Sequence, residues 1–438
     1  MLKVAFIKVN MMYSKGKDAL KPLIFPIIEA VTPDDVEVTY YDERIEKLPE
    51  QFDADIVAMS VETFAARHAY ELADRYRKEG VRICMGGFHA SAEPDEILEH
   101  ADTVLIGDAE DTWARYIEDV KNGVEKSRYE SGNKCSLIPI NNNAKCFRGK
   151  KYLKMGMVQA SRGCKFNCDF CSIKSLYPAG VRQKDIDEVA REVKESKEKL
   201  IFFIDDNLFL NDESAKKLFE AIKPLKKKWA CQISIEVAFK DDILTLMKES
   251  GCMMVLIGFE SLNEDNLKLM NKTANLRVKH YEDAINNIYA HGIMIYGMFV
   301  LGYDHDTAAS IKETMDFALR NNLAIANFNP LMLLPGTPLY KRMKEEGNLI
   351  FGKWWLDENY RYGDAMFVPK SMTPDELSDG CKNARFTYNS YRNILKRLKG
   401  AKVNHSCLTN TVVFLLANLI SRSEIKRKQG TGLGDRKE

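Results

Sequence analysis

Three cysteines stand close together in the sequence, at Cys164, Cys168 and Cys171. Their C-x3-C-x2-C spacing falls in a polar loop directly after a strand-like stretch, residues 155–160. Three thiolates at this spacing can bind three irons of a 4Fe–4S cubane and leave the fourth iron without a protein ligand. An iron with an open coordination position is a place for chemistry, whereas a fully ligated cluster mainly stores or passes electrons.

Two other uses of cysteine fit the triplet less well. A zinc site would need a fourth Cys or His at ligand spacing, and the nearest histidines, His89 and His100, are far upstream. A disulfide role is at odds with a chain that has no secretory features. The remaining cysteines are scattered, and we expect buried apolar residues in a reducing cytoplasm rather than ligands of a second cluster. They are Cys84, Cys135, Cys146, Cys231, Cys252, Cys381 and Cys407.

The cysteine triplet resembles the signature of the radical S-adenosylmethionine (SAM) enzymes. In that family SAM chelates the open iron, and an electron from the reduced cluster cleaves SAM to give a 5′-deoxyadenosyl radical. The resemblance therefore implies a 4Fe–4S cluster, SAM as cofactor, and an external electron donor such as flavodoxin or ferredoxin. Phe170, the aromatic residue before the last cysteine, matches the family position that lies against the adenine of SAM.

Composition limits the class of protein. A chain of 438 residues is too long for one ordinary core, so we expect two or three domains. The formal net charge of +1 gives no general attraction to nucleic acid or anionic membranes. The first residues lack the apolar stretch of a signal peptide, and no apolar run reaches the roughly 18 residues of a membrane span. These features predict a cytoplasmic protein without a transmembrane segment.

The first part of the chain, residues 1–125, alternates short apolar runs with amphipathic ones. We expect strands at 3–8, 36–41, 56–61, 82–85 and 103–106, and helices at 65–78 and 111–120. This alternation predicts an α/β, Rossmann-like domain with a parallel sheet. Ligands bind beyond the carboxyl ends of such strands, where the runs 60–63 and 86–89 fall.

The runs 86–96 and 101–110 resemble the cobalamin-binding domain that precedes the catalytic domain in one radical SAM subgroup. That subgroup includes cobalamin-dependent methylases and the anaerobic magnesium-protoporphyrin cyclase. The D-x-H-x-x-G motif of histidine-ligated cobalamin is absent from residues 8–16, and His89 is expected to be a loop or core residue rather than a cobalt ligand. The alternative is a retained Rossmann-like domain that only packs on the catalytic one. The implied cobalamin contacts are Ser60, Val61, Glu62, Gly86, Gly87, Phe88 and Gly107.

Residues 126–153 are polar and turn-rich and are predicted to be a linker. A second strand–helix series follows over residues 154–348, with strands expected at 155–160, 200–204, 230–235, 254–258, 294–301 and 323–329. Six β/α units in sequence favour a right-handed parallel winding, which suits the partial (β/α)6 barrel of the radical SAM family. In parallel barrels, function gathers at the carboxyl ends of the strands.

Polar residues follow several of these predicted strands and resemble the SAM-contacting motifs of the subgroup. The D-D-N run after the second strand has a plain alternative, an acidic turn that caps the next helix. The glutamate after the third strand has another, an outward-facing side chain. The predicted SAM contacts, with Phe170, are Asp205, Asp206, Asn207, Ser234, Glu236, Glu260 and Pro335.

The last segment, residues 349–438, is predicted to be a mainly helical extension. It holds a long charged helical stretch at 373–398 and an apolar run at 412–420, which either docks on the core or touches a membrane where a lipid substrate lies. The glycine-containing tail, 426–438, is expected to be mobile.

Together these features predict an enzyme that works under anaerobic conditions and cleaves SAM reductively, acting as a cobalamin-dependent methyltransferase on an unactivated carbon of a small-molecule or lipid substrate. No catalytic residues beyond the cluster ligands are expected, since the cofactors make and break the bonds. One alternative is a cyclase or rearranging enzyme of the same subgroup that transfers no methyl group. The other is a non-catalytic module that senses cobalamin or redox state.

Overall fold

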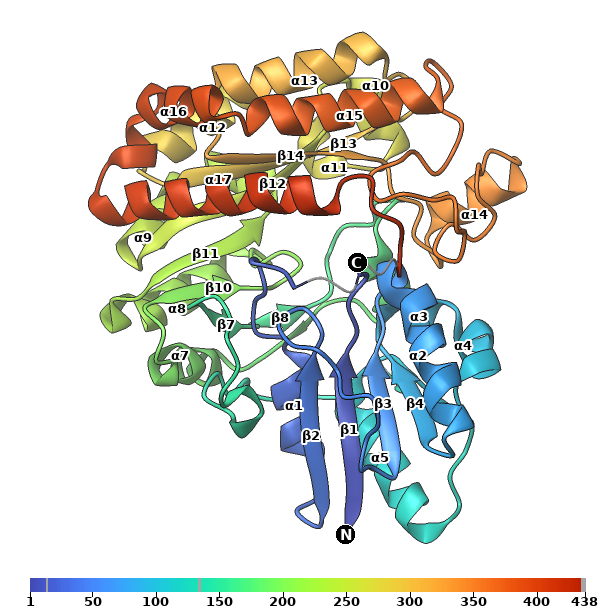
Figure 1. Ribbon diagram of the computed structural model, residues 1–438. Helices are drawn as coiled ribbons and strands as arrows, with labels where there is room; N and C mark the ends of the chain where they lie inside the picture. The colour runs from blue at the N-terminus through green and yellow to red at the C-terminus, as the bar shows by residue number, and fades with distance from the viewer. Residues whose placement is uncertain (13–14, 133–134, 435–438) are drawn as a thin grey trace.

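The computed structural model describes residues 1–12, 15–132 and 135–434, arranged in two α/β halves with a helical extension (Figure 1). The first half holds a parallel sheet of order β2-β1-β3-β4-β5-β6. Its strands are β1 (Leu2–Lys8), β2 (Val36–Asp42), β3 (Ile56–Ser60), β4 (Arg82–Gly86), β5 (Thr103–Ile106) and β6 (Arg128–Glu130). The predicted strands are all present, and β6 carries the sheet past the predicted boundary at residue 125 by pairing with β5.

Helices cover both faces of this first sheet. They are α1 (Ile24–Val31), α2 (Ala66–Lys78), α3 (Phe88–Ala92), α4 (Pro94–His100) and α5 (Ala109–Asn122). The apolar sides of α2 and α5 are buried, and Gly123 ends α5 in the left-handed conformation at φ 69°. The strand order reverses between β1 and β3, and doubly wound sheets bind ligands at such a switch point.

The second half is an open, six-stranded parallel sheet of order β14-β13-β12-β11-β10-β7. Its strands are β7 (Gly156–Val158), β10 (Leu200–Phe203), β11 (Lys228–Ile233), β12 (Cys252–Glu260), β13 (Met294–Leu301) and β14 (Ile325–Pro330). Each connection carries a helix: α7 (Ile186–Glu195), α8 (Asp212–Ile222), α9 (Asp241–Glu249), α10 (Glu264–Leu269), α11 (Thr273–Leu276), α12 (Tyr281–Ala290) and α13 (Ala308–Arg320). Strands in sequential order with a helix after each form the predicted partial barrel.

A two-stranded antiparallel ribbon, β8 (Ser161–Arg162) with β9 (Arg182–Gln183), lies at the mouth of this barrel. The cysteine loop leaves β8 and ends at the short helix α6 (Ser172–Leu176). The loop is therefore held at the carboxyl end of the barrel strands, where parallel barrels carry their active sites.

The C-terminal extension packs on the barrel through α15 (Pro374–Tyr388), α16 (Tyr391–Gly400) and α17 (Leu408–Lys428), after α14 (Pro338–Glu345) (Figure 1). The prediction of one helix over 373–398 is wrong. The chain leaves the helix at Asn389, and Ser390 caps α16 by accepting a hydrogen bond from the backbone N–H of Asn393.

The apolar run at 412–420 lies within α17, and it docks on the barrel through Phe414 and Asn418, both fully buried. The other side of α17 exposes apolar residues to solvent; these are Leu408, Val412, Leu416 and Leu419. Within the described ranges, no helix combines the length and apolar character needed to cross a membrane.

Part of the predicted mobile tail is packed against the rest of the protein. Leu433 is buried, the backbone N–H of Gly434 donates to the carbonyl of Met11, and that of Tyr362 donates to the carbonyl of Thr431. These contacts place the segment after α17 across the seam between the two halves, near the C label in Figure 1. Residues 435–438 of the predicted tail lie outside the described residues.

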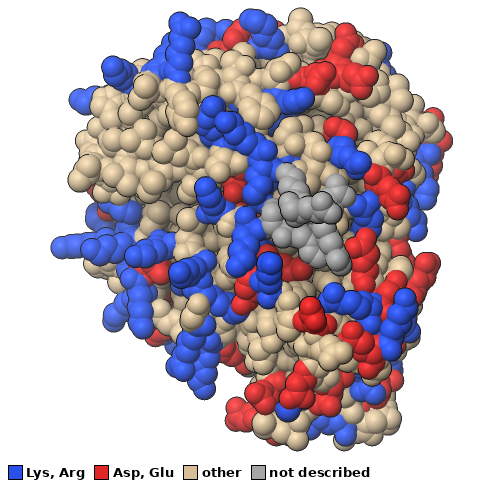
Figure 2. Space-filling view, viewed as in Figure 1, with Lys and Arg blue, Asp and Glu red and all other residues tan. Residues whose placement is uncertain are grey.

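Charge is mixed on the molecular surface, as the near-zero net charge requires. Figure 2 shows Lys and Arg side chains gathered on the barrel side and along the seam between the halves, with Asp and Glu side chains more frequent over the first domain.

Candidate functional site

The three cysteines lie together on the loop between β8 and α6. Cys168 is buried, and Cys164 and Cys171 are half-buried. Burial raises the pKa of all three thiols, to about 12 for Cys168, whereas the backbone N–H groups of Phe166 and Ile173 act to lower the pKa of Cys164 and Cys171. Such N–H groups favour the thiolate, which is the form that binds iron. The loop fits a cluster that is held by three cysteines.

The D-D-N run after β10 holds this loop in place. Asp205 is buried and accepts hydrogen bonds from the backbone N–H groups of Ala160 and Ser161, at 3.1 and 2.5 Å, and from the Ser161 hydroxyl at 2.6 Å. Asp206 accepts from the backbone N–H of Gly163 at 2.9 Å. Both carboxylates therefore position the residues just ahead of Cys164.

Asn207, the third residue of that run, is different. Its side chain is buried, and neither its amide oxygen nor its amide nitrogen has a hydrogen-bond partner among the described residues. An unpaired buried amide costs stability unless a ligand satisfies it. These two orphaned atoms fit a polar ligand such as SAM, and the SAM contact predicted for Asn207 stays a prediction.

The backbone at position 163 accommodates only glycine. It adopts φ +96°, and a Cβ there would lie 2.6 Å from the carbonyl oxygen of Gly180, two residues before β9. The turn into the cysteine loop is therefore tight and packed against the segment just before β9.

Two more predicted SAM residues face the cysteine loop from the segment just after β11. Lys165, within the loop, donates to Glu236 at 2.8 Å, and Ser234 donates to the same carboxylate at 3.3 Å. Glu236 is thus turned towards the barrel mouth rather than outward. Its contact with SAM remains a prediction.

Glu260 ends β12 with a backbone φ of 60°, an uncommon conformation for a residue other than glycine and one often found at functional sites. Its carboxylate pairs with Lys272 at 2.6 Å. Burial raises the pKa of Cys168 and Cys171, and the positive charge of the nearby Lys272 ammonium opposes that rise. The sequence analysis missed Lys272, which has no motif around it.

Asp169, inside the cysteine loop, connects that loop to two further strand ends. The Tyr303 hydroxyl, after β13, donates to its carboxylate at 2.6 Å, and Arg342 of α14 pairs with it at 3.1 Å. The backbone N–H of Leu339 donates to the Asp169 carbonyl. These contacts hold the segment that contains Pro335 next to the cysteine loop. Pro335 lines a cavity there together with Ser172 and Ser175 of α6.

The predicted cobalamin residues gather at the carboxyl edge of the first sheet. Ser60, Gly86, Gly87 and Gly107 line a narrow slot of about 30 Å³ between strand ends, walled by apolar side chains. A Cβ at Gly87 would lie 2.7 Å from the carbonyl oxygen of Val61, so only glycine leaves this cradle open. Small residues around a slot fit a ligand that approaches the backbone closely, and cobalamin contacts at these positions remain predictions.

Three further members of the cobalamin set differ in exposure. Val61 is fully buried and anchors the cradle by accepting from the backbone N–H of His89. Glu62 pairs with Lys8 at 2.5 Å. Phe88 exposes 44% of its surface although it is aromatic, and it lines the same cavity as Pro335. Phe88 therefore presents an apolar surface to the cluster side of the cleft.

His89 is a core residue, as expected. It is fully buried, and its Nε2 lies 3.1 Å from Glu96 and 2.9 Å from the Tyr70 hydroxyl. Trp355 also donates to Glu96 at 2.9 Å, and Lys353 pairs with it at 2.7 Å. This network ties the first domain to the C-terminal extension and leaves His89 no access to the cleft.

A cavity of about 310 Å³ lies where the two halves meet. Glu62, Thr63 and Phe88 line it from the first domain, and Ser172 and Pro335 line it from the barrel. The predicted cobalamin edge and the helix that follows the cluster cysteines therefore face the same space. Half-buried Phe170 packs against the core within the loop.

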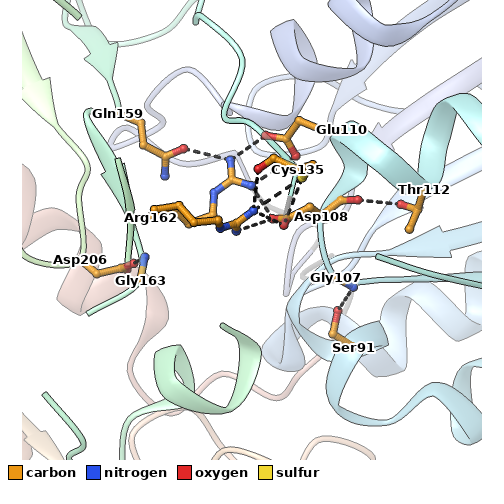
Figure 3. Close-up of polar contacts among 11 residues, drawn as sticks. Ser91, Gly107, Asp108, Glu110, Thr112, Cys135, Gln159, Arg162, Gly163 and Asp206 are labelled. Carbon is orange, nitrogen blue, oxygen red and sulfur yellow. Dashed lines mark hydrogen bonds and ion pairs between the residues drawn. The ribbon is translucent and has the colours of Figure 1, made fainter. Parts of the chain in front are cut away.

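A buried ion-pair cluster fastens the two halves together beside this cavity (Figure 3). Asp108, the residue after Gly107, accepts from Arg162 at 2.5 Å and from Arg182 at 2.6 Å. Arg162 also pairs with Glu110 at 2.8 Å and donates to the Gln159 side chain at 2.9 Å. Arg162 stands two residues before Cys164, so this cluster links the cobalamin edge to the cysteine loop.

Cys135 completes that cluster. Its sulfur lies within 4.8 Å of carboxylate oxygens from Asp108 and Glu110, a grouping of metal-ligand types. Arg162 and Arg182 already neutralise these carboxylates. The group is therefore an interdomain ion-pair cluster, and none of these pairings was anticipated from the sequence.

Family comparisons match both halves. Residues 158–318 match the radical SAM superfamily, and residues 27–117 match the B12-binding domain. The chain is 31% identical over 411 residues to a bacteriochlorophyllide d C-12(1)-methyltransferase from Chlorobaculum tepidum, covering 91% of this chain and 88% of that protein. It is 28% identical to a hopanoid C-2 methylase from Rhodopseudomonas palustris, covering 74% of this chain and 64% of the relative.

Solved structures share the fold. The methyltransferase TsrM from Kitasatospora setae, with cobalamin and a [4Fe-4S] cluster bound, superposes with a TM-score of 0.64 at 14% identity over 79% of this chain and 75% of that one. The cobalamin-dependent enzyme OxsB, with cobalamin and SAM bound, gives a TM-score of 0.64 at 13% identity over 99% of this chain and 77% of that one.

The matched families agree with the geometry of both halves. The cysteine loop lies in the half that matches the radical SAM superfamily, whose members use a 4Fe–4S cluster and SAM, and the glycine cradle lies in the half that matches the B12-binding domain. The chain is therefore an enzyme of the radical SAM superfamily and belongs to the group that joins a B12-binding domain to the radical SAM domain and includes cobalamin-dependent methyltransferases and the magnesium-protoporphyrin cyclase.

Proposed function

We propose that this enzyme transfers a methyl group to an unactivated carbon of a small organic substrate held between its two halves. The observation that carries the proposal is the shared cavity, lined on one side by Glu62 and Phe88 and on the other by Ser172 and Pro335. When bound, the cluster with SAM would supply a radical that abstracts hydrogen, and cobalamin would supply the methyl group.

The chain's own residues position the cysteine loop and SAM and enclose the cavity. Asp205 and Asp206 fix the turn into the cysteine loop, and Lys272 places a positive charge beside it. Asn207 offers an unpaired buried amide, and Glu260 offers carboxylate oxygens, as hydrogen-bonding groups for SAM. Phe88 and Pro335 give the cavity apolar walls, which keep water from a reactive radical.

The predicted site set is proposed as one assembly on these grounds. Cys164, Cys168 and Cys171 hold the cluster. Phe170, Asp205, Asp206, Asn207, Ser234, Glu236, Glu260 and Pro335 surround SAM. Ser60, Val61, Glu62, Gly86, Gly87, Phe88 and Gly107 form the cobalamin edge. We also propose that the enzyme works in the cytoplasm and that a flavodoxin or ferredoxin supplies its electrons.

Relatives with similar sequences act on different substrates, a bacteriochlorophyllide in one case and a hopanoid in another. A further relative, 22% identical over 82% of this chain and 63% of the relative, is an anaerobic magnesium-protoporphyrin IX monomethyl ester cyclase from Cereibacter sphaeroides. Cyclisation without methyl transfer is therefore the second candidate.

Product analysis separates the two candidates. The protein is purified without oxygen, loaded with cobalamin and cluster, and incubated with SAM, a reductant and candidate tetrapyrroles or isoprenoid lipids. Methyl transfer predicts S-adenosylhomocysteine and 5′-deoxyadenosine in equal amounts, together with methylated product. 5′-Deoxyadenosine alone, with an unmethylated but altered substrate, would support the cyclase, and intact SAM under all conditions would support a sensing module.

A further inference from the structure

A second cavity, of about 320 Å³, lies at the switch point of the first sheet. Residues after β1 and β3 line it on one side, the end of β14 on another, and the C-terminal extension closes it. Its walls are largely apolar, from Met11, Phe64, Met332, Tyr360, Tyr362 and Met366. Among the predicted cofactor residues, only Glu62 borders this cavity.

Arg385 of α15 also lines this cavity, and it is only 6% exposed. Its Nε donates to the backbone carbonyl of Cys381 at 3.3 Å, but its Nη2 has no hydrogen-bond partner among the described residues. No carboxylate within the described ranges forms an ion pair with it. A buried guanidinium without a counter-charge is costly, and an anion that enters the cavity would remove that cost.

The other cations at the cavity wall have carboxylate partners. Lys8 pairs with Glu62 at 2.5 Å, Arg44 with Asp42 at 2.7 Å, and Lys428 with Asp18 at 2.8 Å. Arg427 pairs with Glu424 in the last turns of α17. Arg385 is thus the cation of the wall that lacks a protein counter-ion in the described part of the chain.

We propose that this cavity binds the substrate, and that Arg385 receives a carboxylate of that substrate. The guanidinium plane suits a carboxylate, which accepts two parallel hydrogen bonds from it. The apolar walls select an organic body attached to that carboxylate. The inference rests on the proposed methyl transfer and specifies the class of its substrate: an apolar molecule that carries a carboxylate away from the carbon that is methylated.

The position of the cavity explains how such a substrate reaches the reaction site. Glu62, Phe64 and Met332 line both this cavity and the one that faces the cysteine loop. A molecule anchored at Arg385 extends past Phe64 and Met332 towards Phe88 and α6. The carboxylate would then fix which carbon lies at the junction, a positioning role that is typical of remote binding groups.

The test compares an apolar carboxylate with its neutral ester on the holoenzyme. Dansyl-undecanoate and its methyl ester are equilibrated by dialysis against protein loaded with cluster and cobalamin, without reductant, so that no turnover occurs. The wild type should bind the acid about tenfold more tightly than the ester, the range expected for hydrogen bonds to a charged group. Arg385→Met should bring the two affinities close together, and Arg385→Lys should keep part of the preference.

Arg392→Met provides the matched control, because Arg392 is an exposed arginine on the adjacent helix. This variant should keep the full preference for the acid. The thermal midpoint of Arg385→Met without ligand should equal or exceed that of the wild type, because an unpaired buried charge has been removed. A fall of several degrees in that midpoint would make Arg385 a structural residue and overturn the proposal.

Three results in the binding experiment would also overturn it. They are equal affinity of the wild type for acid and ester, a preference that survives in Arg385→Met, and loss of the cobalamin absorption bands in Arg385→Met. The last would assign Arg385 to a polar group of cobalamin rather than to substrate. Since binding is measured without turnover, a preference for the acid with no methylated product refutes the proposed function alone.

Discussion

The ion-pair cluster around Asp108 provides a quantitative test of how the cysteine loop is held. Asp108→Asn keeps the size of the side chain and removes the charge that Arg162 and Arg182 share. Breaking a buried ion pair by removing one partner costs about 3–5 kcal/mol. Arg162 keeps Glu110 and Gln159 as partners, so we expect a smaller loss, about 2 kcal/mol.

Hydrogen–deuterium exchange followed by mass spectrometry measures this loss locally. The free energy needed to open β8 should fall by about 2 kcal/mol, which makes exchange of its amides roughly 30-fold faster. Peptides that cover the barrel strands β12 and β13 should exchange as in the wild type. Asp35→Asn is the control, because Asp35 pairs with Lys121 on the exposed surface of the first domain, and its loss should change little.

A double-mutant cycle then tests the specific contact. If Asp108 acts through Arg182, the change caused by Asp108→Asn should shrink once Arg182→Met is present, because the two residues are directly paired. Unchanged exchange at β8 in Asp108→Asn would refute the idea that this cluster fixes the loop. Additive effects of the two substitutions would refute a direct contact between them.

Three other changes have defined outcomes. Cys168→Ala should abolish SAM cleavage, because the cluster loses a ligand. The circular dichroism spectrum should remain that of a folded protein. Continued formation of 5′-deoxyadenosine would contradict the cluster assignment. Lys272→Met removes a positive charge that interacts with Cys168 and Cys171. An EPR-monitored redox titration should therefore find a lower reduction potential for the cluster. An unchanged potential would show that this charge does not act on the cluster. Glu96→Gln should destabilise the protein at neutral pH: burial works to raise the pKa of Glu96, but hydrogen bonds from His89, Lys353, Tyr70 and Trp355 hold it at about 2. That stabilisation amounts to at most about 3 kcal/mol; it is present above the ordinary glutamate pKa near 4.5 and is lost as the pH falls towards 2. The difference in thermal midpoint between wild type and variant should therefore narrow below about pH 4.5. A difference that does not change with pH would contradict this linkage between the Glu96 pKa and stability.

Much of the fold could be predicted from the chain alone, because each buried parallel strand is a short apolar run between amphipathic helices. The strands β5 and β13 fall at the predicted residues, and the other predicted strands differ by one or two residues at their ends. The break at Asn389 was missed because the charged pattern continues on both sides of it. Only the cap at Ser390 marks the new helix.

The cysteine loop could be found from the sequence because its three ligands lie within one short segment. The contacts that hold this loop could not, because they join segments far apart in the chain. Arg162 meets Asp108 across 54 residues, and Tyr303 meets Asp169 across 134. That Arg385 has no carboxylate partner among the described residues could not be predicted either, because it depends on which side chains the fold packs around α15.

The central claim is that cluster and cobalamin share one cavity, and EPR of the enzyme loaded with both tests it most directly. With the cluster reduced and cobalamin in its cob(II) state, the fast-relaxing cluster should relieve power saturation of the cobalamin signal, because in the proposed assembly both paramagnets border the cavity that Phe88 and Ser172 line. Cys168→Ala, which should lack an intact cluster, should restore the saturation of cobalamin alone. If the cluster and cobalamin are both present at full occupancy and each EPR signal saturates as it does without the other cofactor, the account is contradicted. The two cofactors would then lie too far apart to act on one substrate.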